Sequence, residues 1–401
     1  GAPAYTIHRR IYREKAFAGV DGQFGLNDNL YTDTLFMVDE ASMIANMGLG
    51  GTTFGSGCLL DDLVKFVYQG HNDRLLLIGD KAQLPPVGEE ESPALSASVM
   101  EGYGLKVYEC DLNEVLRQSQ SSGILYNATL IRQMITHDAV TGLPLIRFKG
   151  FADIVMMPGA ELVESLGDSY HHVGMDETMV ITRSNKRANI YNNGIRNMVL
   201  DREEELSSGD MLMIVKNNYF WTEKEKKESG EGSAGAVPAF LANGDRAKVL
   251  RVSNYIELYG FRFATLLLQL PDYDDYEMQV TGMLDTLQSE APALTHEQQE
   301  ELFRQVEEDY QHFVPLKADR MKSIRQDAYF NALQIKYAYA VTCHKAQGGQ
   351  WAHVYVDQGY MTDDMLTPDY IHWLYTAFTR ATDKLFLVNW PKEQTCEPTD
   401  L

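Results

Sequence analysis

Two adjacent carboxylates, Asp39 and Glu40, follow the apolar run Leu35–Val38. Enzymes that split nucleoside triphosphates use one carboxylate to hold Mg²⁺ and another to orient or deprotonate the attacking water. Adjacent acidic residues at a strand end can serve both purposes, because the strand presents them together. We therefore assign Asp39 to the metal and Glu40 to the water. The alternative is an acidic cap on a following helix, which is common.

A second apolar run is followed by Gly79-Asp80 and then by Gln83. An amide side chain can donate to a phosphate oxygen and accept from water, so Gln83 could sense a γ-phosphate. The pair Pro85-Pro86 stiffens the loop and would hold the amide in one pose. The alternative is a plain turn after a strand.

An arginine ends the polar helical stretch Tyr375–Arg380, and Arg117 lies in a second candidate stretch, Leu112–Gln118. Two guanidinium groups facing one phosphate stabilise the charge that develops during its transfer. We expect Arg380 to meet the acidic pair and the glutamine in a crevice between two closing lobes, which would couple hydrolysis to motion. Arg117 taken alone is an ordinary solvated charge.

Polar residues also follow an apolar run at Val341–Gly348, including Thr342 and His344. Side chains of these types suit contacts to phosphodiester oxygens, and Gly348 lets a ligand approach the backbone. For the histidine, the alternative is a satisfied interior side chain. Aromatic residues at 219–221 are candidates for base stacking, although such runs more often belong to a core.

Apolar runs predict the elements that position these residues. Short runs ending in polar residues suit parallel strands that are buried on both faces. Helix-like stretches, such as Cys58–Tyr68 and Gly123–Ile135, lie between them. The alternation predicts an α/β protein with two cores, whose ligands bind at the carboxyl ends of the strands. The expected strands are Leu35–Val38, Leu75–Ile78, Met179–Thr182, Ala338–Thr342, Val354–Asp357 and Leu385–Val388.

The alternation breaks after the turn Asn243-Gly244-Asp245, where Ala247–Val252 and Phe261–Leu270 predict antiparallel strands. A helix is expected at Thr295–Tyr310, and a mobile loop at Thr222–Gly235. The predicted domains are a partial first core at 1–118, a second core at 119–240 and 330–401, and a β-rich insertion at 241–329.

The net charge of −22 opposes nucleic-acid binding, because neutralising phosphates requires basic residues. Residues 271–310 carry half of it, so a basic groove elsewhere is compatible with the composition. No apolar run approaches the roughly 18 residues of a membrane span. The four cysteines are scattered, which argues against a zinc site and favours a reducing compartment such as the cytoplasm.

Together these stretches resemble superfamily 1 DNA helicases of the 5′-to-3′ branch, and among them the RecD-like (exonuclease V α-subunit) and Dda-like enzymes. The resemblance covers almost the whole chain. Asp39–Met43 resembles motif II, Gly79–Val87 motif III, Leu112–Gln118 motif IV, Val341–Gly348 motif V and Tyr375–Arg380 motif VI. Tyr5–Arg9 resembles the segment after motif Ia, and Asn243-Gly244-Asp245 the turn that opens an SH3-like insertion.

The resemblance implies two RecA-like cores that clamp ATP and Mg²⁺, with single-stranded DNA across their tops and a duplex-splitting pin at about 10–33. It implies catalytic roles for Asp39, Glu40, Gln83, Arg117 and Arg380, and nucleotide contacts for Asp80, Gly348 and Thr379. It implies DNA contacts for Thr6, His8, Pro85, Thr342, His344 and Lys345.

One family feature is missing: no G-x-x-x-x-G-K-[ST] phosphate loop occurs in the 401 residues. We therefore expect a fragment of an ATP-dependent helicase acting in DNA repair or recombination, inactive alone, with duplex junctions and the subunits of a repair nuclease as candidate partners. The alternative is a non-catalytic module that binds single-stranded DNA or a repair partner. A nuclease subunit with another chemistry is less favoured, because no D/E-x-K cluster stands out.

Overall fold

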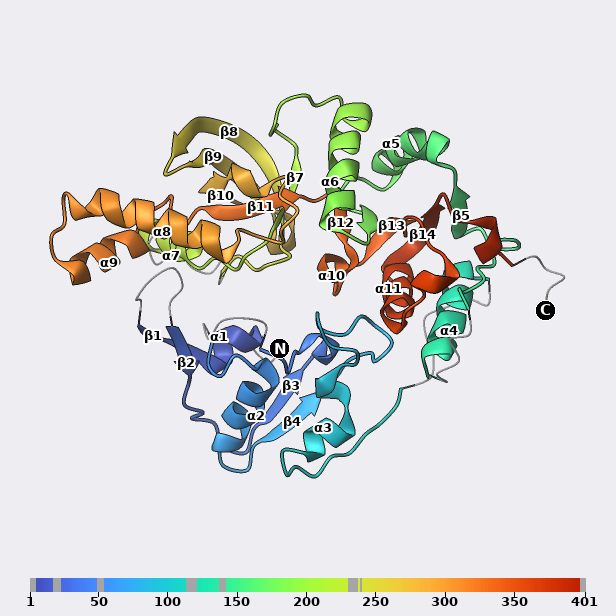
Figure 1. Cartoon of the computed structure of the whole chain (residues 1–401), viewed down its shortest axis with the longest axis horizontal. Coiled ribbons are helices and arrows are strands. Elements are labelled where there is room, and N and C mark those ends of the chain that lie inside the picture. Colours follow the sequence, from blue (N-terminus) through green and yellow to red (C-terminus); the bar gives the residue numbers. More distant parts are fainter. Residues whose placement is uncertain are drawn as a thin grey trace. The chain divides into compact units, whose positions relative to one another are not determined.

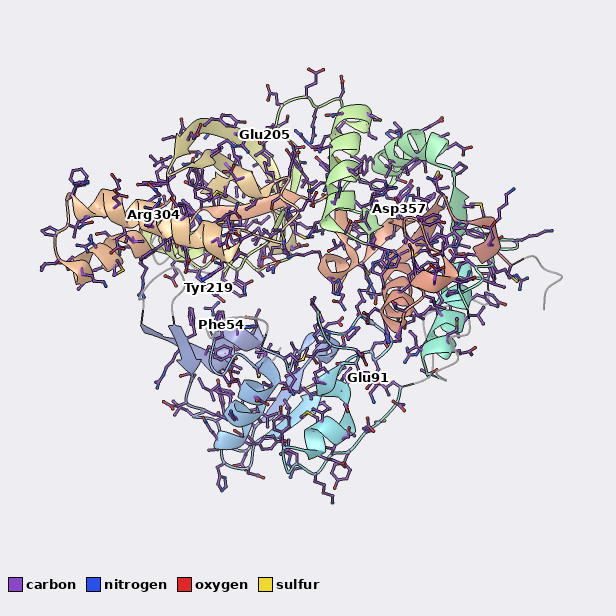
Figure 2. All side chains as sticks on the ribbon, in the orientation of Figure 1. Phe54, Glu91, Glu205, Tyr219, Arg304 and Asp357 are labelled. Carbon is purple, nitrogen blue, oxygen red and sulfur yellow. The ribbon has the colours of Figure 1, made fainter. Side chains whose placement is uncertain are left out.

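The computed structural model describes residues 5–16, 23–48, 54–112, 121–136, 142–229, 237–238 and 240–396. The chain forms two compact units, shown in Figure 1, with their side chains in Figure 2. The first comprises Gly1–Pro144 and Thr362–Thr379, and the second Leu145–Met361 and Arg380–Leu401. A late segment that includes helix α11 (Pro368–Phe378) therefore belongs to the first unit. These limits differ from the predicted boundaries at 118, 240 and 330.

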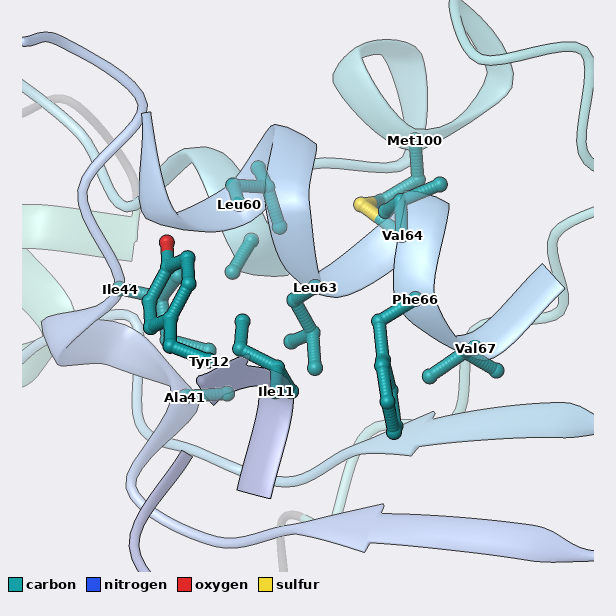
Figure 3. Packing of buried hydrophobic residues seen from close by; sticks show 11 residues of the cluster. Ile11, Tyr12, Ala41, Ile44, Leu60, Leu63, Val64, Phe66, Val67 and Met100 are labelled. Atoms are coloured by element: carbon teal, nitrogen blue, oxygen red, sulfur yellow. The ribbon is translucent and has the colours of Figure 1, made fainter. Parts of the chain in front are cut away.

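The first unit contains two parallel strands, β3 (Leu35–Val38) and β4 (Arg74–Leu77), at the predicted places. The connecting helix α2 (Leu59–Gln69) supplies Leu60, Leu63 and Phe66 to a buried cluster, shown in Figure 3. Alternate strand residues pack against this cluster, as period-two alternation requires. The opposite strand face is apolar and exposed. It carries Leu35, Met37, Leu76 and Ile78.

The described part of this unit also contains five further α-helices and strands. A hairpin lies within the region predicted to form the pin, and residues 17–22 between its strands lie outside the described residues. Helices α4 and α11 pack against each other. The elements are α1 (Ile7–Ile11), β1 (Tyr12–Ala16), β2 (Gln23–Leu26), α3 (Ala97–Glu101) and α4 (Gly123–Thr136).

The second unit contains a five-stranded, wholly parallel sheet in the order β12-β6-β13-β14-β5. Four of its strands lie where apolar runs predicted them. The strands are largely buried, as a parallel sheet requires. The strands are β5 (Ile154–Met157), β6 (Thr178–Thr182), β12 (Ala340–Thr342), β13 (Trp351–Asp357) and β14 (Ala381–Val388). The helices beside them are α5 (Leu162–His172), α6 (Asn185–Gly194) and α10 (Cys343–Ala346).

The same unit contains a closed barrel in the order β10-β11-β7-β8-β9. The antiparallel pair β8 and β9 confirms the predicted strands, but β7 and β11 come from outside the predicted insertion at 241–329. The strands are β7 (Met211–Ile214), β8 (Arg246–Leu258), β9 (Phe261–Leu270), β10 (Tyr276–Met283) and β11 (Leu333–Tyr337). The accompanying helices are α7 (Phe220–Ser229), α8 (His296–Gln311) and α9 (Lys317–Arg325).

Two local predictions need correction. Residues 222–229 are helical in α7 rather than a loop, and 230–236 lie outside the described residues. Trp221 is only 4% exposed and donates its indole N–H to the Asn331 carbonyl at 2.9 Å. Tyr219 stacks on Phe240 at a centroid distance of 4.9 Å. Trp221 therefore serves packing, as the alternative interpretation had it, while base stacking by Tyr219 and Phe220 stays a prediction. No helix in the described ranges is long and apolar enough to cross a membrane.

Candidate functional site

The ends of β3 and β4 lie side by side because their hydrogen-bonded ladder continues past the strands. The Ile78 N–H donates to the Val38 carbonyl, and the Ala41 N–H donates to the Ile78 carbonyl, both at 2.8 Å. Gly79 permits this approach, since a Cβ there would lie 2.9 Å from the backbone nitrogen of Ser42. The acidic pair and Asp80 are therefore presented at one edge of the strands.

The acidic pair has an unusual backbone. Glu40 has φ 51° and ψ 38°, a left-handed conformation that is uncommon outside glycine. Asp39 Oδ1 accepts the Glu40 N–H at 2.9 Å, and the Asp39 side chain is exposed. No cluster of three or more His, Cys, Asp or Glu suited to a metal occurs in the described ranges. An exposed carboxylate still suits Mg²⁺, which usually binds one or two carboxylates plus phosphates and water.

The loop after β4 is anchored to helix α11 on both sides of Gln83. The Ala82 carbonyl lies 2.9 Å from Nδ1 of His372. The Leu84 N–H donates to Oγ1 of Thr376 at 2.8 Å, and both groups are buried. The buried Oε1 of Gln83 has no hydrogen-bond partner among the described residues. A buried acceptor without a partner is rare in folded proteins, and it marks Gln83 as a candidate ligand contact.

The Asp80 carboxylate closes the turn that leads to Gln83. Its Oδ1 accepts the Ala82 N–H at 3.0 Å, and its Oδ2 accepts the Tyr375 hydroxyl at 2.8 Å. Burial, reinforced by the nearby Asp80 carboxylate, raises the pKa of Tyr375 to about 12. Tyr375 is therefore a neutral donor at ordinary pH. Asp80 also pairs with Arg132 on α4, at 3.5 Å.

The second unit holds the residues of the predicted motif V. Helix α10 begins after Thr342, which is half-buried, and His344 is exposed. Lys345 donates from Nζ to Oδ1 of Asn243 at 2.5 Å. Burial lowers the pKa of Lys345 to about 8. This segment therefore presents an exposed imidazole beside a lysine whose charge depends on pH near neutrality.

Arg380 lies in the second unit and is only 5% exposed. Its Nη1 donates to the Gly349 carbonyl at 3.1 Å, and the preceding Gly348 has φ 78°. Because Glu40 and Gln83 belong to the first unit, their convergence with Arg380 stays a prediction. Thr379 ends the first unit and donates its hydroxyl to the Tyr375 carbonyl at 3.0 Å.

The N-terminal segment carries aromatic contacts. His8 packs edge-on against Phe54 at a centroid distance of 5.2 Å, and burial lowers its pKa. The Arg10 guanidinium lies 4.8 Å from the ring centroid of Tyr5 and 4.6 Å from that of Tyr31. Both tyrosines are exposed. The segment thus offers the cation and π surfaces on which bases can stack.

The structure divides the predicted site residues between the two units. The first holds Thr6, His8, Asp39, Glu40, Asp80, Gln83, Pro85 and Thr379, and the second holds Thr342, His344, Lys345, Gly348 and Arg380. Arg117 lies outside the described residues.

Sequence reasoning missed three residues that organise the first group: His372, Thr376 and Arg132. His372 and Thr376 lie one helical turn apart, and Thr376 belongs to the stretch Tyr375–Arg380. This spacing places both side chains on one face of the helix and could have indicated a shared contact. Arg132 stands in an apolar helical stretch, where nothing in the sequence indicates its contact.

Comparison with known proteins supports a helicase relationship for part of the chain. Residues 337–388 match the UvrD-like helicase C-terminal domain. This range spans the predicted motifs V and VI, including Thr342, Lys345 and Arg380. The chain is also 22% identical over 396 residues to the uncharacterized protein R530 of Acanthamoeba polyphaga mimivirus, covering 88% of this chain and 74% of that protein.

Similarity to solved structures is weaker. Pif1 helicase from Candida albicans is 14% identical, with 91% of this chain and 75% of that chain covered and a TM-score of 0.37. Pif1 helicase from Bacteroides, in complex with ADP-AlF3 and single-stranded DNA, is 12% identical, with 91% and 72% covered and a TM-score of 0.44.

Proposed function

We propose that this chain is the motor part of an ATP-dependent superfamily 1 DNA helicase, which moves 5′-to-3′ on single-stranded DNA and unwinds duplexes. The observation that carries this proposal is the anchoring of the Gln83 loop to α11 through Ala82 and Leu84. A motor must connect the sensor of the γ-phosphate to the element that bears the charge-neutralising arginine. Helix α11 ends just before Thr379 and Arg380. The helicase match at 337–388 supports the same function.

The nucleotide site is proposed at the carboxyl ends of β3 and β4. Asp39 would hold Mg²⁺, Glu40 would orient the attacking water, and Gln83 would contact the γ-phosphate. ATP and Mg²⁺ supply the phosphoryl group and the charge that positions it. Arg380 and Arg117 are proposed to neutralise the charge that develops on the phosphate, while Asp80, Gly348 and Thr379 shape the site.

Single-stranded DNA is the proposed polymer substrate. Its contacts are proposed to come from the N-terminal segment and from the start of α10, where side chains suit phosphate contacts. The hairpin β1–β2 is the proposed pin that splits the duplex, and the barrel is the proposed SH3-like domain. The residues proposed to contact DNA are Thr6, His8, Pro85, Thr342, His344 and Lys345.

Two finer assignments complete the proposal. The parallel sheets are proposed as RecA-like cores, the first of them incomplete within these 401 residues. The exposed apolar face of β3 and β4 supports this, because parallel sheets are normally covered on both faces. A RecD-like or Dda-like subtype, a role in repair or recombination, and association with nuclease subunits are proposed from the sequence resemblance alone.

The 401-residue chain itself is proposed to hydrolyse ATP negligibly, since it contains no phosphate loop. The test of function therefore uses the protein expressed from its complete reading frame. We expect single-stranded DNA to stimulate ATP hydrolysis. We also expect the protein to unwind a partial duplex with a 5′ tail but not one with a 3′ tail.

Glu40→Gln is the matched variant, since it keeps the shape of the side chain and removes its basicity. It should lower kcat by about 10²- to 10⁴-fold while single-stranded DNA binding persists. DNA binding without hydrolysis in the complete protein would instead support the alternative, a non-catalytic binding module. Hydrolysis unaffected by Glu40→Gln would refute the assigned site.

A further inference from the structure

Arg132 forms an ion pair with Asp80 in the first unit, and the function proposed above gives Arg132 no role. Arg132, on α4, places Nη1 3.5 Å from Oδ2 of Asp80 and donates to the Tyr375 hydroxyl at 3.3 Å. The Tyr375 hydroxyl donates in turn to the same Asp80 oxygen at 2.8 Å. Three side chains from the loop after β4, from α4 and from α11 therefore form a closed triangle of contacts.

Stability alone does not account for this triangle. The side chains of Arg132 and Asp80 are 42% and 23% exposed, and water screens such pairs so that they contribute little to folding. The protonation states of Arg132 and Tyr375 follow from their surroundings. Burial opposes the charge on Arg132, but Asp80 and Tyr375 raise its pKa, and Tyr375 stays neutral. The triangle thus joins a cation and a neutral donor to the Asp80 side chain.

The triangle acts on the loop through Asp80. The other carboxylate oxygen of Asp80, Oδ1, accepts the Ala82 N–H. This hydrogen bond sets the turn that leads to Gln83. The neighbours of Gln83 are held to α11 by His372 and Thr376. A carboxylate that rotated away would release the turn at its start while its far end stayed attached. Arg132 and Tyr375 together restrict that rotation.

We propose that Arg132 is a positioning residue that holds the Asp80 carboxylate against Tyr375 and thereby transmits the state of the Gln83 loop to α11. The inference rests on the proposed ATPase function, which supplies the phosphate that Gln83 senses. Arg132 does not touch the nucleotide in this scheme. Its effect is on the coupling between nucleotide and DNA.

The experiment compares Arg132→Ala, Arg132→Lys and Tyr375→Phe in the protein expressed from its complete reading frame. The measured quantity is the ratio of ATP hydrolysis with a poly(dT) oligonucleotide to hydrolysis without it. Arg304→Ala is the matched control. Arg304 lies on α8 (Figure 2). It pairs with Glu301, and the two side chains are 61% and 45% exposed. Both arginine-to-alanine variants should melt at nearly the same temperature as the wild type.

We expect Arg132→Ala to lower the stimulation ratio by about 2- to 30-fold, the range of coupling effects measured for residues that contact neither ligand. Arg132→Lys should recover part of the loss, since an ammonium keeps the charge, and Arg304→Ala should leave the ratio unchanged. The double variant Arg132→Ala/Tyr375→Phe should lose no more than the worse single variant, because both act on one carboxylate. An unchanged ratio in Arg132→Ala, or losses that multiply in the double variant, would overturn the inference.

Hydrogen exchange separates this inference from the proposed function. The backbone amide of Ala82, which Asp80 holds, should exchange faster in Arg132→Ala than in the wild type or in Arg304→Ala, whether or not the protein hydrolyses ATP. The Leu84 amide, which Thr376 holds, should exchange at the wild-type rate. Unchanged exchange refutes the positioning role alone. A wild-type protein with no hydrolysis, together with faster exchange in the variant, refutes the proposed function and with it the coupling, but retains the structural contact.

Discussion

The Leu84 N–H donates to the Thr376 hydroxyl at 2.8 Å across a sequence separation of 292 residues. Thr376 is wholly buried, and its hydroxyl donates in turn to the His372 carbonyl at 2.8 Å. The threonine hydroxyl thus accepts from a backbone amide and also donates its own proton within the helix. A loop after a strand of the first unit is thereby joined to a helix near the end of the chain.

Thr376→Val should destabilise the protein. Valine keeps the shape of threonine but removes the hydroxyl that accepts the buried Leu84 amide, and losing this hydrogen bond costs about 1–3 kcal/mol. Urea unfolding followed by circular dichroism measures the change. Thr136→Val is the control, because the exposed Thr136 hydroxyl donates to a carbonyl of its own helix. The free energy of unfolding of this variant should differ from that of the wild type by no more than about 0.5 kcal/mol. Equal unfolding midpoints for the two variants would contradict the assigned role of Thr376.

Gly79→Ala should disturb the acidic pair. A Cβ at this position would lie 2.9 Å from the Ser42 nitrogen and 3.3 Å from the Ala41 nitrogen, and backbone cannot move aside cheaply. We expect a loss of about 1–3 kcal/mol in the free energy of unfolding, together with slower ATP hydrolysis in the complete protein.

Gly194→Ala is the control for this substitution. Nothing lies within 4 Å of a Cβ at that helical position, so alanine should be neutral or stabilise the protein by up to about 1 kcal/mol. A Gly79→Ala protein as stable and as active as the wild type would show that the close approach of the two strand ends is not required.

Lys345 should make DNA binding depend on pH. Burial lowers its pKa from 10.5 to about 8, so its charge is present below that value and is lost as the pH rises through it. If the Lys345 ammonium contacts a phosphate, the loss of its charge should weaken single-stranded DNA binding by about 1 kcal/mol. Fluorescence anisotropy with a labelled oligonucleotide at constant salt measures this. The arginine of Lys345→Arg keeps its charge over the whole pH range of the experiment. The DNA affinity of this variant should therefore not fall as the pH rises through about 8.

The stability of the protein provides an internal check on that experiment. Because the folded pKa of Lys345 lies below the unfolded one, the unfolded chain binds more protons between the two values. The free energy of unfolding should therefore rise with pH in this window while DNA affinity falls. Affinity and stability that fall together would point to unfolding rather than to the loss of a phosphate contact.

Local sequence predicted much of the fold. The apolar runs at β3, β6, β13 and β14 were found because parallel strands buried on both faces need continuous apolar residues. The antiparallel pair β8 and β9 followed from a turn signal and long β-forming stretches. The closing strand β7 was not predicted, although its four consecutive apolar residues form the same kind of run. Its partners β8 and β11 are distant in the chain, and no local pattern indicates that pairing.

The sequence by itself determined which side chains stand at strand ends, among them Asp39, Glu40 and Asp80, because the position of an apolar run decides where its strand stops. Only the tertiary structure decided which elements these side chains contact. The placement of α11 in the first unit, and of Arg132 and Tyr375 on Asp80, depends on packing between segments far apart in the chain. Such contacts carry no local pattern, because one helix face of suitable shape can pack in many places, and the surrounding fold selects among them.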